Sequence, residues 1–248
     1  MMKEKIILNN IKYKGLRSSG LFGKKPIIGL IMFLFGSIIF ISLAYNLINH
    51  GSLIKWDLSL AKFFHSLALK SSPLVINIMI AGYYIGWWGI FLIAIIFSIY
   101  FIYKKFWCEL LTVVISLGFS GLIFLFLSNI FKRPRPFLLF KEVIWSGSPV
   151  IPGFPSGHTL STIVCLGFLL YFLLPRIKSN TYKFLLIFVA FLIAFYIGFS
   201  RLYIGDHYLT DVIAGYAVCI AWFGLSFTSV ELLFKKYYNK KENSSDIR

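Results

Sequence analysis

The segment from Phe199 to Asp211 holds a histidine and an aspartate at a spacing that suits nucleophilic chemistry. His207 and Asp211 are four residues apart, so on a helix they would share one face. The carboxylate can then accept one imidazole N–H and leave the other ring nitrogen free to attack an electrophile. Arg201 lies shortly before this pair, and a cation there indicates an anionic substrate.

A second histidine stands at the start of an apolar run, in the segment Pro155-Ser-Gly-His158. Ser156 suits a helix N-cap and Gly157 permits close backbone approach, and capping alone would explain both. It does not explain His158 in the first turn, where free backbone N–H groups form an anion site. A phosphate bound there would keep His158 protonated, so His158 is a candidate general acid.

A basic cluster, Lys132-Arg-Pro-Arg-Pro136, directly follows another apolar run. The prolines fit a simple helix end, because proline removes a backbone donor and restricts the residue before it. By the charge count given below, however, the cluster lies on the side of the membrane where positive charge is disfavoured. We therefore regard Arg133 and Arg135 as candidate ligands of an anion.

The elements that must position these clusters are apolar helices. Of 248 residues, 58% are hydrophobic and 14% charged, and the mean hydropathy is +0.81. Spanning a bilayer takes roughly 20 apolar residues. Six such stretches run at about 27 to 48, 74 to 103, 107 to 131, 159 to 174, 184 to 199 and 208 to 234, and the second is long enough to tilt.

Residues 53 to 70 alternate apolar and polar side chains at helical spacing, which predicts an amphipathic helix at the membrane interface. The fold class that follows is all-α: a polytopic membrane protein with a six-transmembrane-helix bundle. We expect one membrane domain at 27–234, between basic tails at 1–26 and 235–248.

The distribution of Lys and Arg predicts the orientation. Of 25 such residues, 17 fall on the side that carries both chain ends. By the positive-inside rule both termini are cytoplasmic, and all three clusters face the extracytoplasmic side of the cell membrane. The net charge of +16 is then mostly a topology signal, with attraction to anionic lipid. The scattered basic residues argue against nucleic acid binding.

Metal and cofactor sites are not predicted. The three cysteines lack metal-ligand spacing and read as inert core residues. Of nine acidic residues, only Asp206 and Asp211 fall in the clusters, too few for a two-metal carboxylate site. We interpret Asp206 as a cap or turn residue. Cations and helix-start amides can support phosphoryl transfer without a metal.

The ordered set of Arg-Pro, then Pro155-Ser-Gly-His158, then Ser200-Arg201 with His207 and Asp211 resembles the type 2 phosphatidic acid phosphatase superfamily. The resemblance covers most of the chain apart from its basic ends. It implies a metal-independent phosphatase built on a helical bundle that is related in core architecture to vanadium haloperoxidases.

The resemblance also implies roles for individual residues. His207 would attack phosphorus to give a phosphohistidine, Asp211 would orient it, and His158 would protonate the leaving oxygen. The groups expected to hold the phosphoryl oxygens are Arg135, Arg201, Ser156 and the backbone of Gly157, with Arg133 as a further candidate.

One position departs from the family pattern. With Arg135-Pro136 as the Arg-Pro pair, Ser128 stands where the family has a lysine. Lys132 lies one helical turn later on the same face, and helical side chains lean toward the N-terminus. Our hypothesis is that Lys132 supplies the displaced charge.

A phosphate site at headgroup level favours a lipid substrate whose tail stays in the bilayer. The candidates are a polyprenyl diphosphate, phosphatidic acid, phosphatidylglycerophosphate or a phosphorylated glycolipid. The family resemblance slightly favours the first, whose hydrolysis would recycle a carrier lipid. The apolar loop 137–150 either forms an interfacial lid or packs on the bundle. Alternatives from other classes are a lipid phosphotransferase, a vanadate-dependent peroxidase, and a catalytically weakened protein that binds or transports lipid phosphates.

Overall fold

The computed structural model describes residues 21–145 and 152–245, and within these ranges the regular structure is entirely helical. Six helical stretches of the described chain are long and apolar enough to span a membrane. These spans are α3 (Pro26–Ile48), the second span formed by α5 (Pro73–Tyr84), η2 (Ile85–Gly89) and α6 (Ile90–Lys104), α7 (Trp107–Phe131), α8 (Gly157–Leu173), α9 (Asn180–Tyr203) and α10 (Leu209–Ser245). Shorter helices are α2 (Leu21–Lys24), α4 (Ser52–Leu69), η3 (Pro136–Leu139) and η4 (Leu174–Arg176). The predicted six-span, all-α fold is therefore confirmed.

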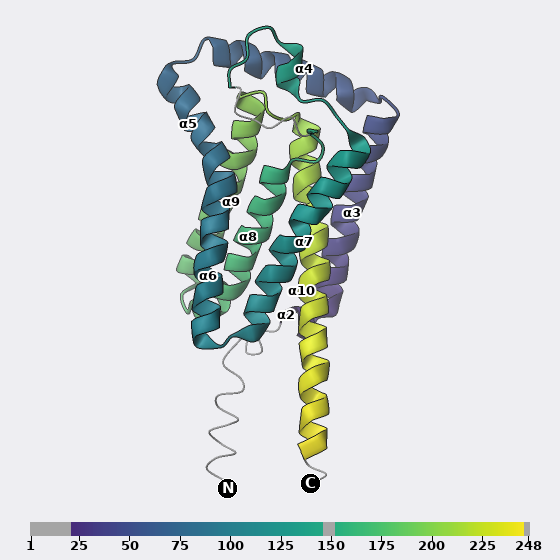
Figure 1. Ribbon diagram of the computed structural model, residues 1–248, viewed down its shortest axis with the longest axis vertical. Coiled ribbons are helices and arrows are strands. Elements are labelled where there is room, and N and C mark those ends of the chain that lie inside the picture. Colours follow the sequence, from purple (N-terminus) through teal and green to yellow (C-terminus); the bar gives the residue numbers. More distant parts are fainter. Residues whose placement is uncertain (1–20, 146–151, 246–248) are drawn as a thin grey trace.

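Helices α8 and α10 form the interior of the bundle. Just over half of the most apolar stretch of each is buried, against 17% for α3 and for the second span, which face outward. Helix α10 packs along α3 and also contacts α7 and α8 (Figure 1). Small residues allow this approach: a Cβ added at Gly36 would lie 2.4 Å from the Ala217 carbonyl oxygen.

The second span is interrupted, whereas its sequence reads as one continuous apolar stretch. Helix α5 ends at Tyr84, and five residues, Ile85–Gly89, form a π-helical turn before α6 begins. Gly82 and Gly86 place this region close to α9, because an added Cβ would meet Ser200 Oγ at 2.3 Å and Ile197 Cγ2 at 2.9 Å. A π-helical turn often lies beside a functional site, and here it packs on the start of α8.

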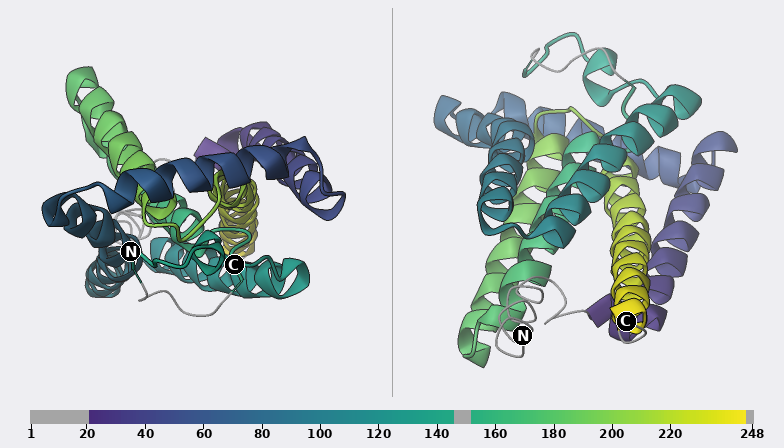
Figure 2. Two further views of the ribbon diagram at one scale, coloured as in Figure 1. Left: turned by 90° about the horizontal axis from the view of Figure 1, so that it is seen from above. Right: turned by 60° about the horizontal axis from the view of Figure 1, so that its bottom comes forward.

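Helix α4 lies across one end of the bundle (Figure 2, left). It is amphipathic as predicted: Asp57, Ala61, Phe64 and Ala68 form its buried face, and Trp56 is 73% exposed. The opposite end carries α2 and the C-terminal part of α10 (Figure 1). An even number of spans places these two segments on one side, in keeping with the predicted topology.

The ordered bundle extends beyond the boundaries expected at 27 and 234. Phe22 of α2 is buried among Tyr171, Phe223 and Phe227, and the Gly23 N–H donates to Glu231 Oε2 at 2.5 Å. Helix α10 continues to Ser245, through most of the segment expected to be a tail. Aromatic burial at the N-terminal side and uninterrupted helix at the C-terminal side explain these differences.

Candidate active site

The three polar clusters of the sequence meet at the end of the bundle that α4 covers. They come from the C-terminal end of α7, the N-terminal end of α8, and the connection between α9 and α10. Backbone hydrogen bonds join the segments: Gly153 N–H donates to Arg133 O at 2.7 Å, and Ser156 N–H donates to Asp211 O at 2.9 Å. The predicted convergence is thus what the structure shows.

His207 lies in the turn between two helices, because α10 begins only at Leu209. Gly205 has a φ of +73°, which ends α9 in the left-handed conformation typical of a helix C-terminus. The His207 Nδ1 atom lies 2.8 Å from the Gly153 carbonyl oxygen. Since a carbonyl only accepts, Nδ1 carries the proton and Nε2 keeps its lone pair. This Nε2 is buried without a hydrogen-bond partner among the described residues.

Asp211 contacts His207 less directly than its spacing predicts. Its Oδ2 lies 3.7 Å from His207 Nδ1, beyond hydrogen-bond distance, and accepts the Tyr208 N–H at 2.9 Å. We expected this carboxylate to accept the imidazole N–H, and that expectation is wrong because the Gly153 carbonyl takes the position. Asp211 still places a negative charge beside the ring.

Arg133 forms ion pairs with two carboxylates, one of which, Asp211, lies beside His207. Its Nη1 donates to Asp211 Oδ1 at 2.6 Å, and its Nη2 donates to Asp57 Oδ2 at 2.7 Å. Thr210 Oγ1 accepts a further bond at 2.7 Å. This corrects the expected phosphate contact of Arg133, whose guanidinium instead holds Asp211. Asp57 was not among the predicted site residues, although a lone acidic residue on the apolar face of an amphipathic helix could have indicated it.

His158 faces the same space as His207. The centroids of the two rings are 6.4 Å apart, and the His158 Nε2 is buried with no hydrogen-bond partner in the described chain. Tyr83 and Trp87 of the second span support the His158 ring at centroid distances of 4.6 and 5.7 Å. The two unpartnered Nε2 atoms therefore belong to one buried cluster.

Ser156 occupies the N-cap position of α8, as predicted, but its hydroxyl makes no capping hydrogen bond. Its Oγ is fully buried and has no partner among the described residues. Gly157 follows, and an added Cβ would lie 3.1 Å from the Phe124 ring. Capping alone thus leaves the Ser156 hydroxyl unexplained, whereas an anion at the start of α8 would satisfy it.

Arg201 and Arg135 supply the positive charge of the pocket. Arg201 is fully buried on α9, and its guanidinium donates to Ser200 Oγ at 3.1 Å and to the Met79 carbonyl oxygen at 3.3 Å. Arg135 is 4% exposed in the loop that follows α7. Both arginines pair with Asp206, through Oδ2 at 3.4 Å for Arg201 and through Oδ1 for Arg135.

Asp206 is therefore a member of the site, which corrects its interpretation as a simple cap or turn residue. It does lie in the turn between α9 and α10, and its side chain pairs with both arginines. Its Oδ2 is also 3.8 Å from His207 Nε2. Burial would raise the pKa of Asp206, but the neighbouring guanidinium groups of Arg135 and Arg201 help to outweigh burial and hold this pKa well below its usual value.

Lys132 does not join this cluster. It ends α7 in a left-handed conformation with a φ of 44°, and its exposed side chain lines a separate groove beside Leu47 and His50. Ser128 is buried and donates to the Leu125 carbonyl oxygen at 3.1 Å. No contact in the described chain supports the hypothesis that Lys132 supplies the missing charge.

The apolar loop after η3 packs on the bundle as far as it is described. Phe140 stacks on His65 at 3.9 Å, and Trp145 packs against Tyr83 at 4.4 Å between ring centroids. Residues 146–150 of the predicted lid lie outside the described residues.

One group of residues has metal-ligand atoms within reach of one another. The ligand atoms of His158, Asp206 and His207 all lie within 4.8 Å. Two guanidinium groups adjoin the same carboxylate, and their charge opposes a divalent cation and favours an anion. The donor set fits phosphate better than a metal ion.

The fold and the site define a class: a multi-pass membrane protein of helices with a buried cluster of two histidines, two arginines and an aspartate. The family model of the PAP2 superfamily matches residues 109–235, just over half of the chain. This protein belongs to the PAP2 superfamily, which confirms the resemblance seen in the motifs.

Curated relatives carry phosphatase names. Phosphatidylglycerophosphatase B of Bacillus subtilis strain 168 is 31% identical over 135 residues, covering 54% of this chain and 64% of the relative. Lipid A 1-phosphatase of Rhizobium johnstonii is 38% identical over 128 residues, covering 47% of each chain. The chain therefore spans less than two thirds of the length of these relatives.

A solved structure resembles most of this chain. The crystal structure of a transmembrane PAP2 type phosphatidylglycerolphosphate phosphatase from Bacillus subtilis matches with a TM-score of 0.63 at 25% identity. The match covers 86% of this chain and 96% of that one. The similarity thus extends well beyond the half that the family model describes.

Proposed function

We propose that this protein is a lipid phosphatase that works through a phosphohistidine on His207 and needs no metal ion. The observation that carries the proposal is the pair of buried, unpartnered Nε2 atoms of His158 and His207, which lie in one cluster with Arg135, Arg201 and Asp206. A nucleophile, an acid and two cations are the groups that phosphoryl transfer requires.

In the first step, the His207 Nε2 lone pair attacks phosphorus and the bond from phosphorus to the lipid oxygen breaks. His158, protonated once phosphate is bound, gives its proton to that oxygen. The positive charge on the His207 ring is stabilised by Asp211, and the Gly153 carbonyl holds the ring in place. The Ser156 hydroxyl, the arginines and the free amides of α8 stabilise the phosphoryl oxygens.

In the second step, water attacks the phosphorus of the phosphohistidine while His158 accepts the water proton. The P–N bond breaks, inorganic phosphate forms, and His207 returns with its Nε2 lone pair. The enzyme thus regains its starting protonation after one water molecule is consumed.

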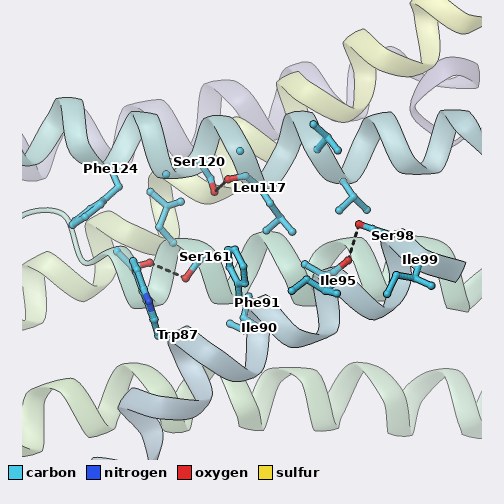
Figure 3. Close-up of a pocket in the computed structure, with 17 residues that line it drawn as sticks. Trp87, Ile90, Phe91, Ile95, Ser98, Ile99, Leu117, Ser120, Phe124 and Ser161 are labelled. Atoms are coloured by element: carbon cyan, nitrogen blue, oxygen red, sulfur yellow. Dashed lines mark hydrogen bonds between the residues drawn. The ribbon is translucent and has the colours of Figure 1, made fainter. Parts of the chain in front are cut away.

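An apolar groove beside the pocket supports a lipid substrate. It has a volume of about 470 Å³ and runs between α6, α7 and α8 (Figure 3). Gly157, Ser161 and Trp87 line it, and Trp87 also packs on His158. The hydroxyls of Ser98, Ser120 and Ser161 bond to carbonyls of their own helices, so the groove wall offers little polarity.

The length of the groove suits one hydrocarbon chain. On the second span its lining runs from Trp87 to Ile99, about 18 Å at 1.5 Å per residue. Half of a hydrocarbon core of about 30 Å is similar. We infer that the phosphate enters the histidine pocket while one chain lies in the groove. The groove does not distinguish a phosphomonoester from a diphosphate headgroup, so phosphatidic acid, phosphatidylglycerophosphate, a phosphorylated glycolipid and a polyprenyl diphosphate all remain candidate substrates.

We further propose that the site faces the extracytoplasmic side of the cell membrane, with the chain ends in the cytoplasm. The excess of Lys and Arg at the α2 and α10 end of the bundle supports this orientation. Phosphatase and fluorescent-protein fusions at residue 248 and in loop 137–150 would report opposite sides. Alkaline phosphatase activity from a fusion at residue 248 would contradict it.

The proposed activity is tested by phosphate release from purified protein with phosphatidic acid, phosphatidylglycerophosphate and a polyprenyl diphosphate, all in EDTA. We expect release from at least one lipid, and His207→Ala should reduce it by at least about 10⁴-fold. Failure to release phosphate from any of them, or release that only a divalent ion restores, would refute the proposal.

A further inference from the structure

The phosphoryl pocket already contains an anion that belongs to the protein. The Asp206 carboxylate is 1% exposed and divides its oxygens between the pocket's cations, Oδ1 to Arg135 and Oδ2 to Arg201. The same Oδ2 lies 3.8 Å from His207 Nε2. These are the partners that the oxygens of a bound phosphate would need.

The carboxylate and a phosphate cannot use these partners together. For attack, phosphorus has to approach His207 Nε2 to about 3–3.5 Å, so its oxygens would lie where Asp206 Oδ2 now lies. Two anions that share one buried position also repel each other strongly. A substrate therefore binds only after Asp206 releases the arginines.

We propose that Asp206 is a built-in occupant of the phosphoryl pocket, which the substrate phosphate displaces from Arg135 and Arg201, and that it lowers the affinity of the site for small free anions. The inference rests on the proposed function, because that function identifies the pocket as phosphate-binding. The expected ligand class is tetrahedral oxyanions, with inorganic phosphate, the reaction product, first among them.

The charges of the pocket explain why an occupant is useful. Asp206 places a negative charge between the two buried guanidinium groups of Arg135 and Arg201 and so offsets their mutual repulsion when no substrate is bound. A lipid offsets the cost of displacing the carboxylate because its hydrocarbon chain, in the bilayer and in the groove between α6 and α7, keeps its phosphate beside the site at a high local concentration. Inorganic phosphate has no such chain, so Asp206 weakens product inhibition more than it impairs turnover.

The test compares Asp206→Asn with wild type in two measurements. One is the inhibition constant of inorganic phosphate in the lipid assay, and the other is the shift of melting temperature by phosphate at constant ionic strength. Removing the charge should lower the inhibition constant at least about tenfold and enlarge the thermal shift. An unchanged or raised inhibition constant, or a smaller shift, would overturn the proposal.

Asp57→Asn is the matched control. Asp57 is equally buried and also pairs with an arginine. Its partner, however, is Arg133, which does not pair with Asp206. It should lower the melting temperature without strengthening phosphate binding. An equal gain in phosphate affinity in Asp57→Asn would show a general charge effect and would refute the specific role of Asp206.

Two further comparisons keep the result decisive. If Asp206→Asn is too unstable for activity assays, its melting temperature in phosphate against chloride still reports binding, with the same outcomes. Asp206→Glu, which keeps the charge, should keep the weak phosphate affinity of wild type. Absence of lipid hydrolysis by the wild-type protein would refute the proposed function. The thermal shifts test the effect of Asp206 on phosphate binding independently of that result.

Discussion

At the scale of single residues, the backbone sets the protonation of the proposed nucleophile. The Gly153 carbonyl fixes the proton of His207 on Nδ1, and the same loop carries the segment that leads to Ser156. In a serine protease triad the carboxylate selects the tautomer. Here the Gly153 carbonyl selects the tautomer, and Asp211 acts through its negative charge and its ion pair with Arg133.

Asp211→Asn should therefore lower kcat by about 10- to 100-fold, far less than His207→Ala. The tautomer persists because Gly153 still accepts the Nδ1 proton, while the stabilising charge beside the ring is lost. Single-turnover kinetics on a lipid phosphate would measure both variants. A loss in Asp211→Asn as large as that in His207→Ala would contradict the role assigned to Gly153.

The role of His158 as acid is tested by the leaving group. His158→Ala should lose about 10²- to 10⁴-fold activity on an alkyl phosphate, whose oxygen needs a proton as it departs. A nitrophenyl phosphate leaves without that proton, so its cleavage should fall much less. Parallel kcat measurements on the two esters would show whether His158 acts as the general acid. Equal losses on both esters would indicate a structural role instead.

The sequence indicated most of these residues, and its errors share a physical origin. Motif spacing identified His158, Arg201 and His207, because their chemistry depends on residue type. It misjudged Arg133, Asp206 and the partner of His207, because their contacts come from segments far apart in the sequence. The acceptor that meets the His207 ring, for example, is the carbonyl of Gly153 in the loop before α8, which residue spacing does not reveal.

At the scale of elements, apolar length predicted the spans well. Helix α7 begins and ends at the predicted residues 107 and 131, since continuous hydrophobicity and a basic, proline-containing end are strong signals. The π-helical turn at Ile85–Gly89 could not be predicted. It accompanies the close packing of Gly82 and Gly86 on α9, which hydropathy does not record.

The groove between α6 and α7 makes a prediction at this scale. A Cβ added at Gly121 meets no heavy atom within 4 Å, so Gly121→Phe should fold and fill the groove. KM for a long-chain lipid phosphate should rise at least about tenfold, with little change for a short-chain, water-soluble ester. The measurement is KM across a series of chain lengths.

Leu122→Phe is the control for this variant. Leu122 is the next residue on α7, is 58% exposed and does not line the groove. It should leave KM unchanged for every chain length. A rise in KM for short and long esters alike in Gly121→Phe would argue against a chain-binding groove.

At the scale of the whole molecule, the two ends of the bundle have separate tasks. The end with α2 is held by an aromatic cluster in which Phe22, Phe223 and Phe227 pack together, while the site occupies the other end (Figure 1). Phe22→Ala should cost about 3–5 kcal/mol through the cavity it leaves. That corresponds to a fall in melting temperature of roughly 10 °C.

Because Phe22 is remote from the histidine pocket, the same variant should keep the wild-type kcat at a temperature well below its melting point. Thermal unfolding in detergent and a lipid phosphatase assay on one preparation would test both statements. A large fall in kcat for a fully folded Phe22→Ala protein would show that the two ends are coupled.

The ion pairs of Arg133 also govern how the site assembles. Asp57 of α4 bonds to Arg133 and, across 153 positions of sequence, to Thr210. Such distant contacts form late, after the loops between them have closed. The segment 109–235 contains every motif residue but not Asp57, so on its own it would hold Arg133 with one of its two carboxylates missing. We therefore expect catalytic competence only after α4 has packed on Arg133 and on the start of α10.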